Sequence, residues 1–245
     1  MDNKTNPDYI FNPALILDPQ DNIFSDFNSL ISRKFKAVNF KDENLSDLVN
    51  LYYQIQTIRD SISSLTTTDL SIYSAYLSNL EEVLSESFRE FNLNSTTGTW
   101  AVSQEGIGHA MSAAMISLVD ISKSPSVSNL WRFAGLDPNH TKWNPLLKNI
   151  AWKIGKSFQH FSDYNTFYGN IYLDDFNRRQ SMNQKVKDES EVVPTSRLEA
   201  QARRYATKIF MSHWHHIRFR EVYGVDPVMT HSSSTRYIQP PDFPF

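Results

Sequence analysis

The sequence predicts an all-α protein with three parts: a heptad helical hairpin, a tandem helix-hairpin-helix domain and a long basic C-terminal helix. Three observations lead to this prediction. Apolar residues recur at heptad spacing through residues 45–84, which is typical of paired helices. A Gly-Ile-Gly turn stands between two stretches of helical character farther along the chain. No stretch sustains the alternating apolar and polar pattern of a β-strand.

The composition excludes several classes of protein. The 245-residue chain has no cysteine, which excludes disulfide scaffolds and thiolate metal sites. No apolar run approaches the ~20 residues of a membrane span, and the polar start Met1–Lys4 lacks the apolar stretch of a signal peptide. We therefore expect a cytoplasmic protein that does not contact the membrane and that could associate with the nucleoid. We also expect no cofactor.

The charges are unevenly distributed along the chain. Residues 1–121 hold 7 Lys or Arg against 16 Asp or Glu, whereas residues 122–221 hold 16 against 9. A basic second half in a chain of net charge -3 indicates that this half meets a polyanion. The alternative is that the acidic and basic halves attract each other.

The first 92 residues predict an arm and a helical hairpin. Residues 1–44 read as an extended, Pro-containing arm. Residues 45–92 predict a coiled-coil-like pair of helices joined at the polar stretch Thr66–Asp69. The expected seam consists of Leu48, Leu51, Ile55, Ile58, Ile62 and Leu65, followed by Leu70, Tyr73, Leu77, Leu80 and Leu84. The seam either packs on the rest of the same chain or makes a homodimer or higher oligomer through residues 45–90.

Residues 92–98 are rich in Asn, Ser, Thr and Gly and predict a domain boundary. The helix-hairpin-helix domain is expected over residues 99–223. In its first hairpin, glycines permit a tight turn and the following helix starts with free N–H groups, where a phosphate can bind. The expected backbone contacts come from Gly106, Ile107, Gly108, His109 and Ala110. The other interpretation is a purely structural turn.

A second candidate turn lies at Trp131–Pro138 and contains Gly135. After it we expect a solvated loop at residues 177–196, a final helix from Ser196 to Val222, and an irregular tail over residues 224–245. Basic residues expected to reach phosphates are Lys142, Lys148, Arg203, Arg204 and Lys208. The alternative for the arginines is a solvated face that pairs with Glu199 and Glu221.

Aromatic residues interleave with the lysines that follow the second turn. Trp143, Trp152 and Phe158 favour a place in the core over stacking on bases. Farther on, His213 and His216 share a helical face at a spacing that can hold a metal, but no acidic third ligand stands at a clear offset, so packing is the favoured interpretation.

Several of these motifs together resemble a known family. They are Gly106–Gly108 with its alanine-rich helix, Val119–Ile121, Leu130–Pro138, Trp143–Lys148, Tyr168–Tyr172 and Ala202–Lys208. This pattern, over residues 99–220, resembles the C-terminal domain of the bridge-RNA-guided insertion-sequence transposases. The resemblance implies the helix-hairpin-helix fold and places residues 45–92 where that family has its coiled coil.

The chain departs from that family where the chemistry lies. Only a Pro-rich arm precedes the heptad hairpin, so no RuvC-like nuclease domain fits there. The family's serine-bearing loop corresponds to Asn139–Trp143, which has no serine, and Thr141 has no evident partner base. We expect a non-catalytic, largely sequence-independent DNA-binding protein from a mobile element or virus. RNA as the target, a transposase or recombinase subunit, and a structural or assembly protein are the alternatives.

Overall fold

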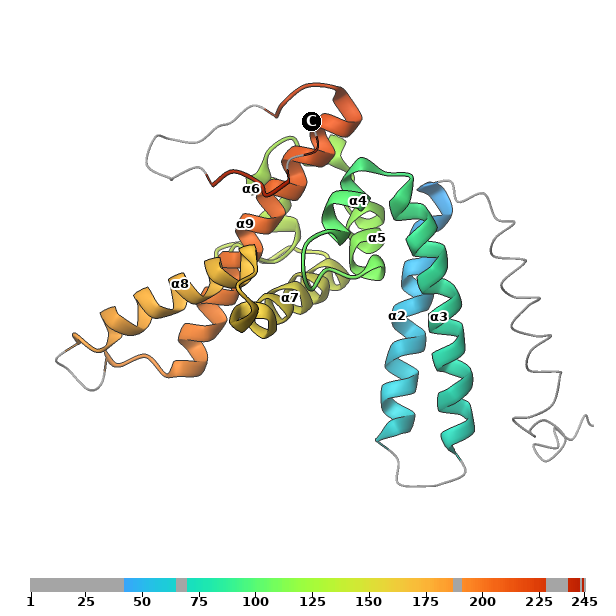
Figure 1. The fold of residues 1–245 in the computed structure, drawn as a ribbon, viewed down its shortest axis with the longest axis horizontal. Helices are drawn as coiled ribbons and strands as arrows, with labels where there is room; N and C mark the ends of the chain where they lie inside the picture. Colours follow the sequence, from blue (N-terminus) through green and yellow to red (C-terminus); the bar gives the residue numbers. More distant parts are fainter. Residues whose placement is uncertain (1–41, 65–69, 187–190, 228–237, 243, 245) are drawn as a thin grey trace, which may run out of the picture. The chain divides into compact units, whose positions relative to one another are not determined.

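The structure is a computed structural model that describes residues 42–64, 70–186, 191–227, 238–242 and 244. Within these ranges it contains eight α-helices, two short 3-10 helices and no strand, which confirms the all-α prediction (Figure 1). The elements are α2 (Asp42–Ser63), α3 (Ser71–Leu93), α4 (Thr96–Val102), α5 (His109–Leu118), η3 (Ile121–Lys123), α6 (Val127–Phe133), α7 (Pro145–His160), η4 (Phe161–Tyr164), α8 (Phe167–Asn183) and α9 (Thr195–Tyr223). Most of the expected arm, residues 1–41, lies outside the described residues.

The chain divides into two compact units, which we describe separately. The first comprises residues 1–39 and 52–84, and the second comprises residues 40–51 and 85–245. The sequence placed a boundary at residues 92–98 instead. Asn92 is fully buried in the second unit, where its side-chain amide donates to the carbonyls of Phe88 and His109 at 2.7 and 2.9 Å. This segment is therefore a packed junction.

In the first unit, α2 and α3 pair through a polar contact that the heptad pattern did not reveal. Arg59 and Glu81 form an ion pair of 3.1 Å, and Glu81 is nearly buried. Of the expected seam, Ile55 and Leu84 are buried, but Ile58 and Tyr73 remain 51% and 38% exposed. The buried faces of α2 and α3 therefore include only part of the predicted apolar seam.

In the second unit, α9 contacts α4, α6, α7 and α8 (Figure 1). Its buried stripe repeats every three or four residues and consists of Leu198, Ala202, Ala206, Phe210, Trp214 and Ile217. Phe158 of α7 and Tyr168 of α8 stack at 4.8 Å, and Phe210 meets both rings. A Cβ on Gly155 would lie 2.8 Å from Thr207 Oγ1, so glycine allows α7 and α9 to approach closely.

The ends of these helices have clear local causes. Asn144 caps α7 by accepting from the amide of Leu147, and Pro145 stands at the first helical position. Gly224 ends α9 with a φ of 71°. The expected final helix is confirmed to within one residue at each end. By contrast, α8 continues through Asn183, so the loop expected from residue 177 begins later.

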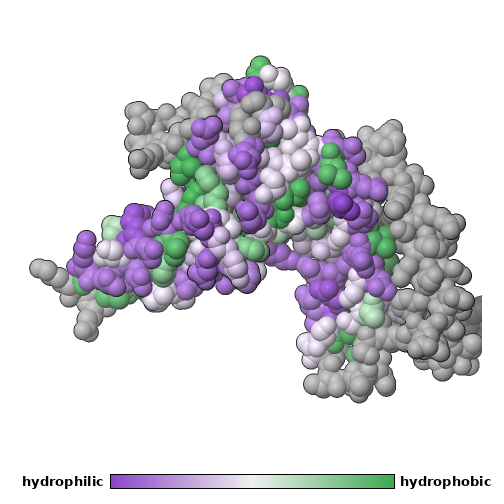
Figure 2. All heavy atoms as spheres, in the orientation of Figure 1, coloured by the Kyte–Doolittle hydropathy of each residue, from purple (hydrophilic) through white to green (hydrophobic). Residues whose placement is uncertain are grey.

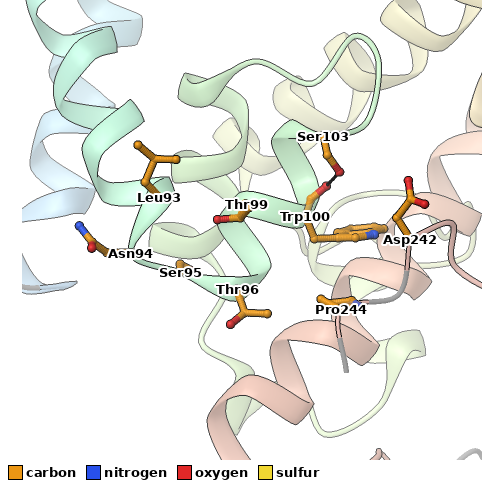
Figure 3. A pocket seen from close by; sticks show the side chains of 9 residues that line it. All are labelled: Leu93, Asn94, Ser95, Thr96, Thr99, Trp100, Ser103, Asp242 and Pro244. Carbon is orange, nitrogen blue, oxygen red and sulfur yellow. Dashed lines mark hydrogen bonds between the residues drawn. The ribbon is translucent and has the colours of Figure 1, made fainter.

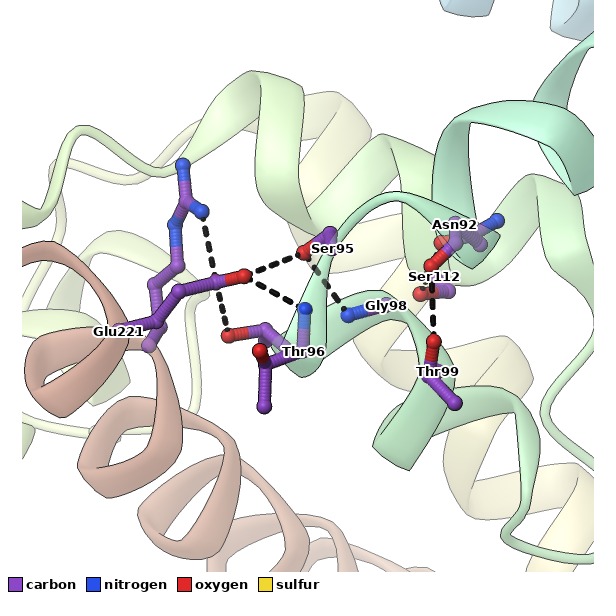
Figure 4. Close-up of polar contacts among 9 residues, drawn as sticks. Asn92, Ser95, Thr96, Gly98, Thr99, Ser112 and Glu221 are labelled. Carbon is purple, nitrogen blue, oxygen red and sulfur yellow. Dashed lines mark hydrogen bonds and ion pairs between the residues drawn. The ribbon is translucent and has the colours of Figure 1, made fainter. Parts of the chain in front are cut away.

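A half-buried carboxylate joins the last turn of α9 to the start of α4 (Figure 4). Glu221, near the end of α9, accepts from Ser95 Oγ at 3.0 Å, from the Thr96 amide at 2.6 Å and from Thr97 Oγ1 at 2.5 Å. Arg218 approaches the same carboxylate at 2.9 Å. Burial alone would raise the pKa of Glu221, but the hydrogen bonds from Thr97, Arg218 and Ser95 outweigh it and hold that pKa below its ordinary value. The start of α4 is thereby tied to α9.

Candidate nucleic-acid interface

The Gly-Ile-Gly segment forms a tight turn between α4 and α5. Gly106 adopts a φ of +87°, a conformation that side chains with a Cβ disfavour. Ile107 is 4% exposed, as expected for a residue that plugs the turn into the core. Gly108 has ordinary extended angles, φ -82° and ψ 164°, and α5 begins immediately after it.

The two glycines of this turn have different surroundings. A Cβ on Gly106 would lie 2.2 Å from Ser157 Oγ and 2.9 Å from Phe161 Cδ2, whereas a Cβ on Gly108 would have no atom of the described residues within 4 Å. Ser157 also donates to the Gly106 carbonyl at 2.7 Å. Gly106 is therefore required by the fold, and Gly108 leaves the approach to α5 open.

The first amides of α5 have no acceptor within the helix. The first helical hydrogen bond there runs from the Ser112 amide to the Gly108 carbonyl at 3.1 Å, which leaves the three preceding amides without a partner inside the helix. Among the described residues, no side chain caps this end. A hollow of about 440 Å³ adjoins the turn and is lined by residues 102–108 together with Ser157 and Phe161.

His109 stands at the first position of α5. Burial is the main cause that lowers its pKa below the ordinary value, and the positive charge of Arg89 adds to this effect while Glu86 opposes it. In the described part of the chain, its buried Nδ1 has no hydrogen-bond partner. The ring therefore brings no charge of its own to this helix end at neutral pH.

The second turn resembles the first in having a glycine with a positive φ. It differs because the helix that follows it is capped by a side chain. Gly135 has a φ of +67° and Leu136 is 7% exposed. The helix that follows, α7, is already closed by the side chain of Asn144. An anion at the second turn must therefore be bound by side chains.

Basic side chains do surround the second turn. A Cβ on Gly135 would lie 2.8 Å from Lys148 Cδ. Lys208 lies 4.9 Å over the ring of Trp131, and burial is the main cause that lowers its pKa, opposed by Asp137. Asp137 also pairs with Arg132 at 3.5 Å.

The other predicted contacts fall into two groups. Lys142, Lys148 and Arg204 are exposed, so they are accessible to a ligand. Arg203 is packed instead: its guanidinium donates to Gln159 of α7 at 2.7 Å, pairs with Glu199 at 3.6 Å and is only 14% exposed. The structure therefore gives Arg203 a place between α7 and α9, and it leaves Arg204 on the surface.

The histidines of α9 are engaged in packing. His213 contacts the Tyr168 hydroxyl at 2.8 Å and the Ile238 carbonyl at 2.7 Å, and His215 contacts the Ser124 carbonyl at 2.7 Å. His216 lies 3.0 Å from Asp226. Over the described ranges, no three His, Asp or Glu residues group in a way that could hold a metal ion. Thr141 is exposed in the loop before α7.

A second hollow, of about 420 Å³, lies beside α4 (Figure 3). The hydroxyl residues Thr96, Thr99 and Ser103 line one side, and Asp242 and Pro244 of the tail line another. Trp100 holds the tail by donating its indole N–H to the Pro241 carbonyl at 2.9 Å. The described residues that line this hollow include no basic side chain, unlike those around the second turn.

On the face shown in Figure 2, hydrophilic residues dominate the surface of α8, and hydrophobic residues gather in small separate groups.

In the described part of the chain, no helix is long and apolar enough to span a bilayer. Sequence reasoning missed Ser157 and Phe161 and the hydrogen bonds of Glu221 with residues 95–97, because these partners are far away in the chain and leave no local signal. No family model, curated protein or solved structure matches this chain.

Proposed function

We propose that this protein binds nucleic-acid backbone, DNA in the first place, without reading its sequence. The two hairpins, α4–α5 and α6–α7, would form a tandem helix-hairpin-helix unit. The observation that carries the proposal is the uncapped start of α5, which begins directly after the open Gly108. A phosphate oxygen placed there would accept from the amides of residues 109–111 and would be favoured by the helix dipole.

The second hairpin supports this proposal by a different means. Its helix end is occupied by Asn144, so the contact would come from side chains. Lys148 lies against Gly135, and Lys208 lies over the Trp131 ring at the same turn. Arg204 is close enough to Lys208 to lower its pKa, and Lys142 precedes α7. These four cations on the second hairpin and on α9, which packs against it, suit a polyanion that extends from the first hairpin.

We further propose that the protein is transposase-derived and does not cut DNA. The support comes from the sequence, where Asn139–Trp143 stands in place of the family's serine-bearing loop. Incubation with supercoiled plasmid and Mg²⁺ or Mn²⁺ should leave the plasmid intact. Nicking that one point substitution abolishes would instead establish the transposase or recombinase alternative.

Self-association through residues 45–90 is part of the same proposal. Within the first unit, Ile58 and Tyr73 of the predicted seam are exposed, and a second copy would cover them. Light scattering should show a dimer or higher oligomer that Ile58→Asp converts to monomer. Ser78→Asp, which adds the same charge on an exposed position of α3 away from Tyr73, should leave the assembly intact.

The test of backbone binding uses Gly108→Asp. Aspartate at this position would cap α5 and place a negative charge where the phosphate sits, so the helix should gain slightly in stability while binding is lost. Affinity for two duplexes of unrelated sequence should fall about tenfold, and equally for both. Ser181→Asp, which adds the same charge on an exposed position of α8, is the matched control.

Two outcomes would contradict the proposal. Unchanged duplex affinity of a folded Gly108→Asp protein would place the site elsewhere. A folded wild-type protein that binds no polynucleotide at low salt would favour the structural or assembly alternative.

A further inference from the structure

The outer face of α7 exposes an unusual pair of side chains. Trp152 is 57% exposed in the middle of the helix, and Trp143, just before the helix, is 39% exposed. The sequence interpretation placed both rings in the core. Only Phe158, the third aromatic residue of that group, is there, with no exposed surface.

The core of the second unit does not require these two rings. The inward face of α7 is already filled by Leu147, Ile150, Ile154 and Phe158, each fully buried. Leaving a large aromatic ring in water forgoes the favourable free energy of burying it. An exposed tryptophan opposite a complete inward face therefore indicates a surface that binds something.

Positive charge accompanies both tryptophans. Lys148 Nζ lies 3.7 Å from the centroid of the Trp143 ring. Lys148 and Lys156 stand one turn before and one turn after Trp152, about 6 Å away along the helix axis. The whole of α7, Pro145–His160, contains no Asp or Glu. The face therefore alternates flat rings with cations and has no acidic residue of its own.

This face is continuous with the second turn of the proposed interface. Lys148 reaches both surfaces, because its side chain lies against Gly135 and its ammonium lies over Trp143. A nucleic-acid strand whose phosphates contact the cations at the turn would continue along the outer face of α7.

We propose that the outer face of α7 binds unpaired nucleotides, with bases stacked on Trp143 and Trp152 and phosphates held by Lys148 and Lys156. Rings that alternate with cations are the pattern by which proteins bind single strands without reading sequence. Base-paired duplex offers no free base face to these rings, so this surface distinguishes unpaired from paired nucleic acid. The charge of the face argues for a polyanion and against an apolar protein partner. The inference rests on the proposed function and adds the kind of strand bound.

The experiment compares Trp152→Leu with Trp152→Phe. Both substitutions leave an apolar residue on the surface, but only phenylalanine retains a π-face for stacking. Fluorescence anisotropy at low salt would measure affinity for a labelled oligo-dT, an oligo-U and a duplex of equal length. The two single-stranded probes show whether the sugar matters.

We expect Trp152→Leu to weaken single-strand binding about tenfold, Trp152→Phe to weaken it less than threefold, and duplex binding to change less than twofold in either. Trp143→Leu should behave in the same way. Binding of the oligonucleotides should also quench tryptophan fluorescence, and Trp152→Phe should reduce that quenching.

Unchanged single-strand affinity in Trp152→Leu, or an equal loss on duplex and single strand, would overturn the stacking inference. Neither result would affect the hairpin proposal, provided that Gly108→Asp still weakens duplex binding. Failure of the wild-type protein to bind any polynucleotide would contradict both.

Discussion

Replacing Gly106 by alanine should destabilise the second unit, while the same change at Gly108 should not. At Gly106 the backbone φ is +87°, and a side chain in the left-handed region costs about 1–2 kcal/mol. The new methyl carbon would also lie 2.2 Å from Ser157 Oγ. If the hydroxyl rotates away, its hydrogen bond to the Gly106 carbonyl is lost, which adds about 1 kcal/mol.

The unfolded chain partly offsets these costs. Exchange of glycine for alanine lowers the entropy of the unfolded state and returns about 0.4–1 kcal/mol. The net destabilisation of Gly106→Ala is therefore about 2 kcal/mol, equivalent to a melting temperature lower by about 4–8 °C. At Gly108 the loss of a favourable cap residue and the entropy gain nearly cancel, so the change should stay within about 2 °C.

Circular dichroism at 222 nm would follow thermal unfolding of both variants, with urea unfolding as a second measure. Equal melting temperatures for the two alanine variants would refute the distinction between a structural Gly106 and an accessible Gly108. A larger loss for Gly108→Ala would reverse the two roles. The comparison needs no ligand, so it tests the geometry of the turn independently of any function.

Two further predictions concern charged groups of α9. Charge reversal of the exposed Arg204 should flatten the dependence of log affinity on log salt by about 1 without lowering the melting temperature, whereas reversal of the packed Arg203 should lower the melting temperature and leave the salt slope unchanged. Glu221→Gln retains the shape but removes the charge that accepts from Thr97 and the Thr96 amide, so it should destabilise the fold by about 2 kcal/mol at pH 7. An unaltered urea midpoint in Glu221→Gln would show that the carboxylate does not anchor α4.

Local sequence signals predicted helix ends and turns well because the causes are themselves local. Pro145 and Gly224 sit where α7 begins and α9 ends, and Gly106 has the positive φ that a tight turn needs. Burial of Ile107 follows from its apolar side chain between two glycines. These features depend on a few neighbouring residues, which the sequence displays directly.

The identity of a side chain's partner was much harder to predict. A basic residue near a phosphate-binding turn favours a ligand contact, yet Arg203 meets Gln159, 44 positions away in the chain. Likewise, the heptad pattern records apolar residues and ignores the ion pair of Arg59 with Glu81, which helps set the inward faces of α2 and α3. Periodicity predicts that a helix has an apolar face. The contacts with packing partners determine which residues of the helix are buried.

The last prediction concerns the stability of the fold below neutral pH and follows from the partners of His213. A backbone carbonyl can only accept, so the nitrogen facing Ile238, Nε2, must carry the proton. Nδ1 then accepts from the buried Tyr168 hydroxyl. Protonating Nδ1 would place two donors against each other unless that hydroxyl turned away. Neutral His213 therefore fits this site and its cation does not.

The pKa of His213 is correspondingly low, about 4, mainly because the ring is buried. The hydrogen bond to the Ile238 carbonyl opposes this effect, and the neighbouring His216 adds to it. In the unfolded chain the pKa is about 6.5, so between these values the unfolded state binds more protons than the folded state. Stability is thus full above about pH 6.5 and falls as the pH drops toward 4. Between pH 7 and pH 5 the loss from this residue is roughly 2 kcal/mol.

Urea unfolding at pH 7 and pH 5 would measure this loss, with His213→Gln and His160→Gln compared against wild type. Buried His215 has a lowered pKa of the same origin and adds to the wild-type loss, so His213→Gln should reduce the pH dependence without abolishing it. His160 is exposed at the end of α7, so His160→Gln is the matched control for the loss of an imidazole. Since glutamine cannot supply the same pair of hydrogen bonds, the variant should also be less stable at pH 7. A wild-type protein equally stable at both pH values, or a His213→Gln variant with undiminished pH dependence, would show that His213 does not control the acid sensitivity of this fold.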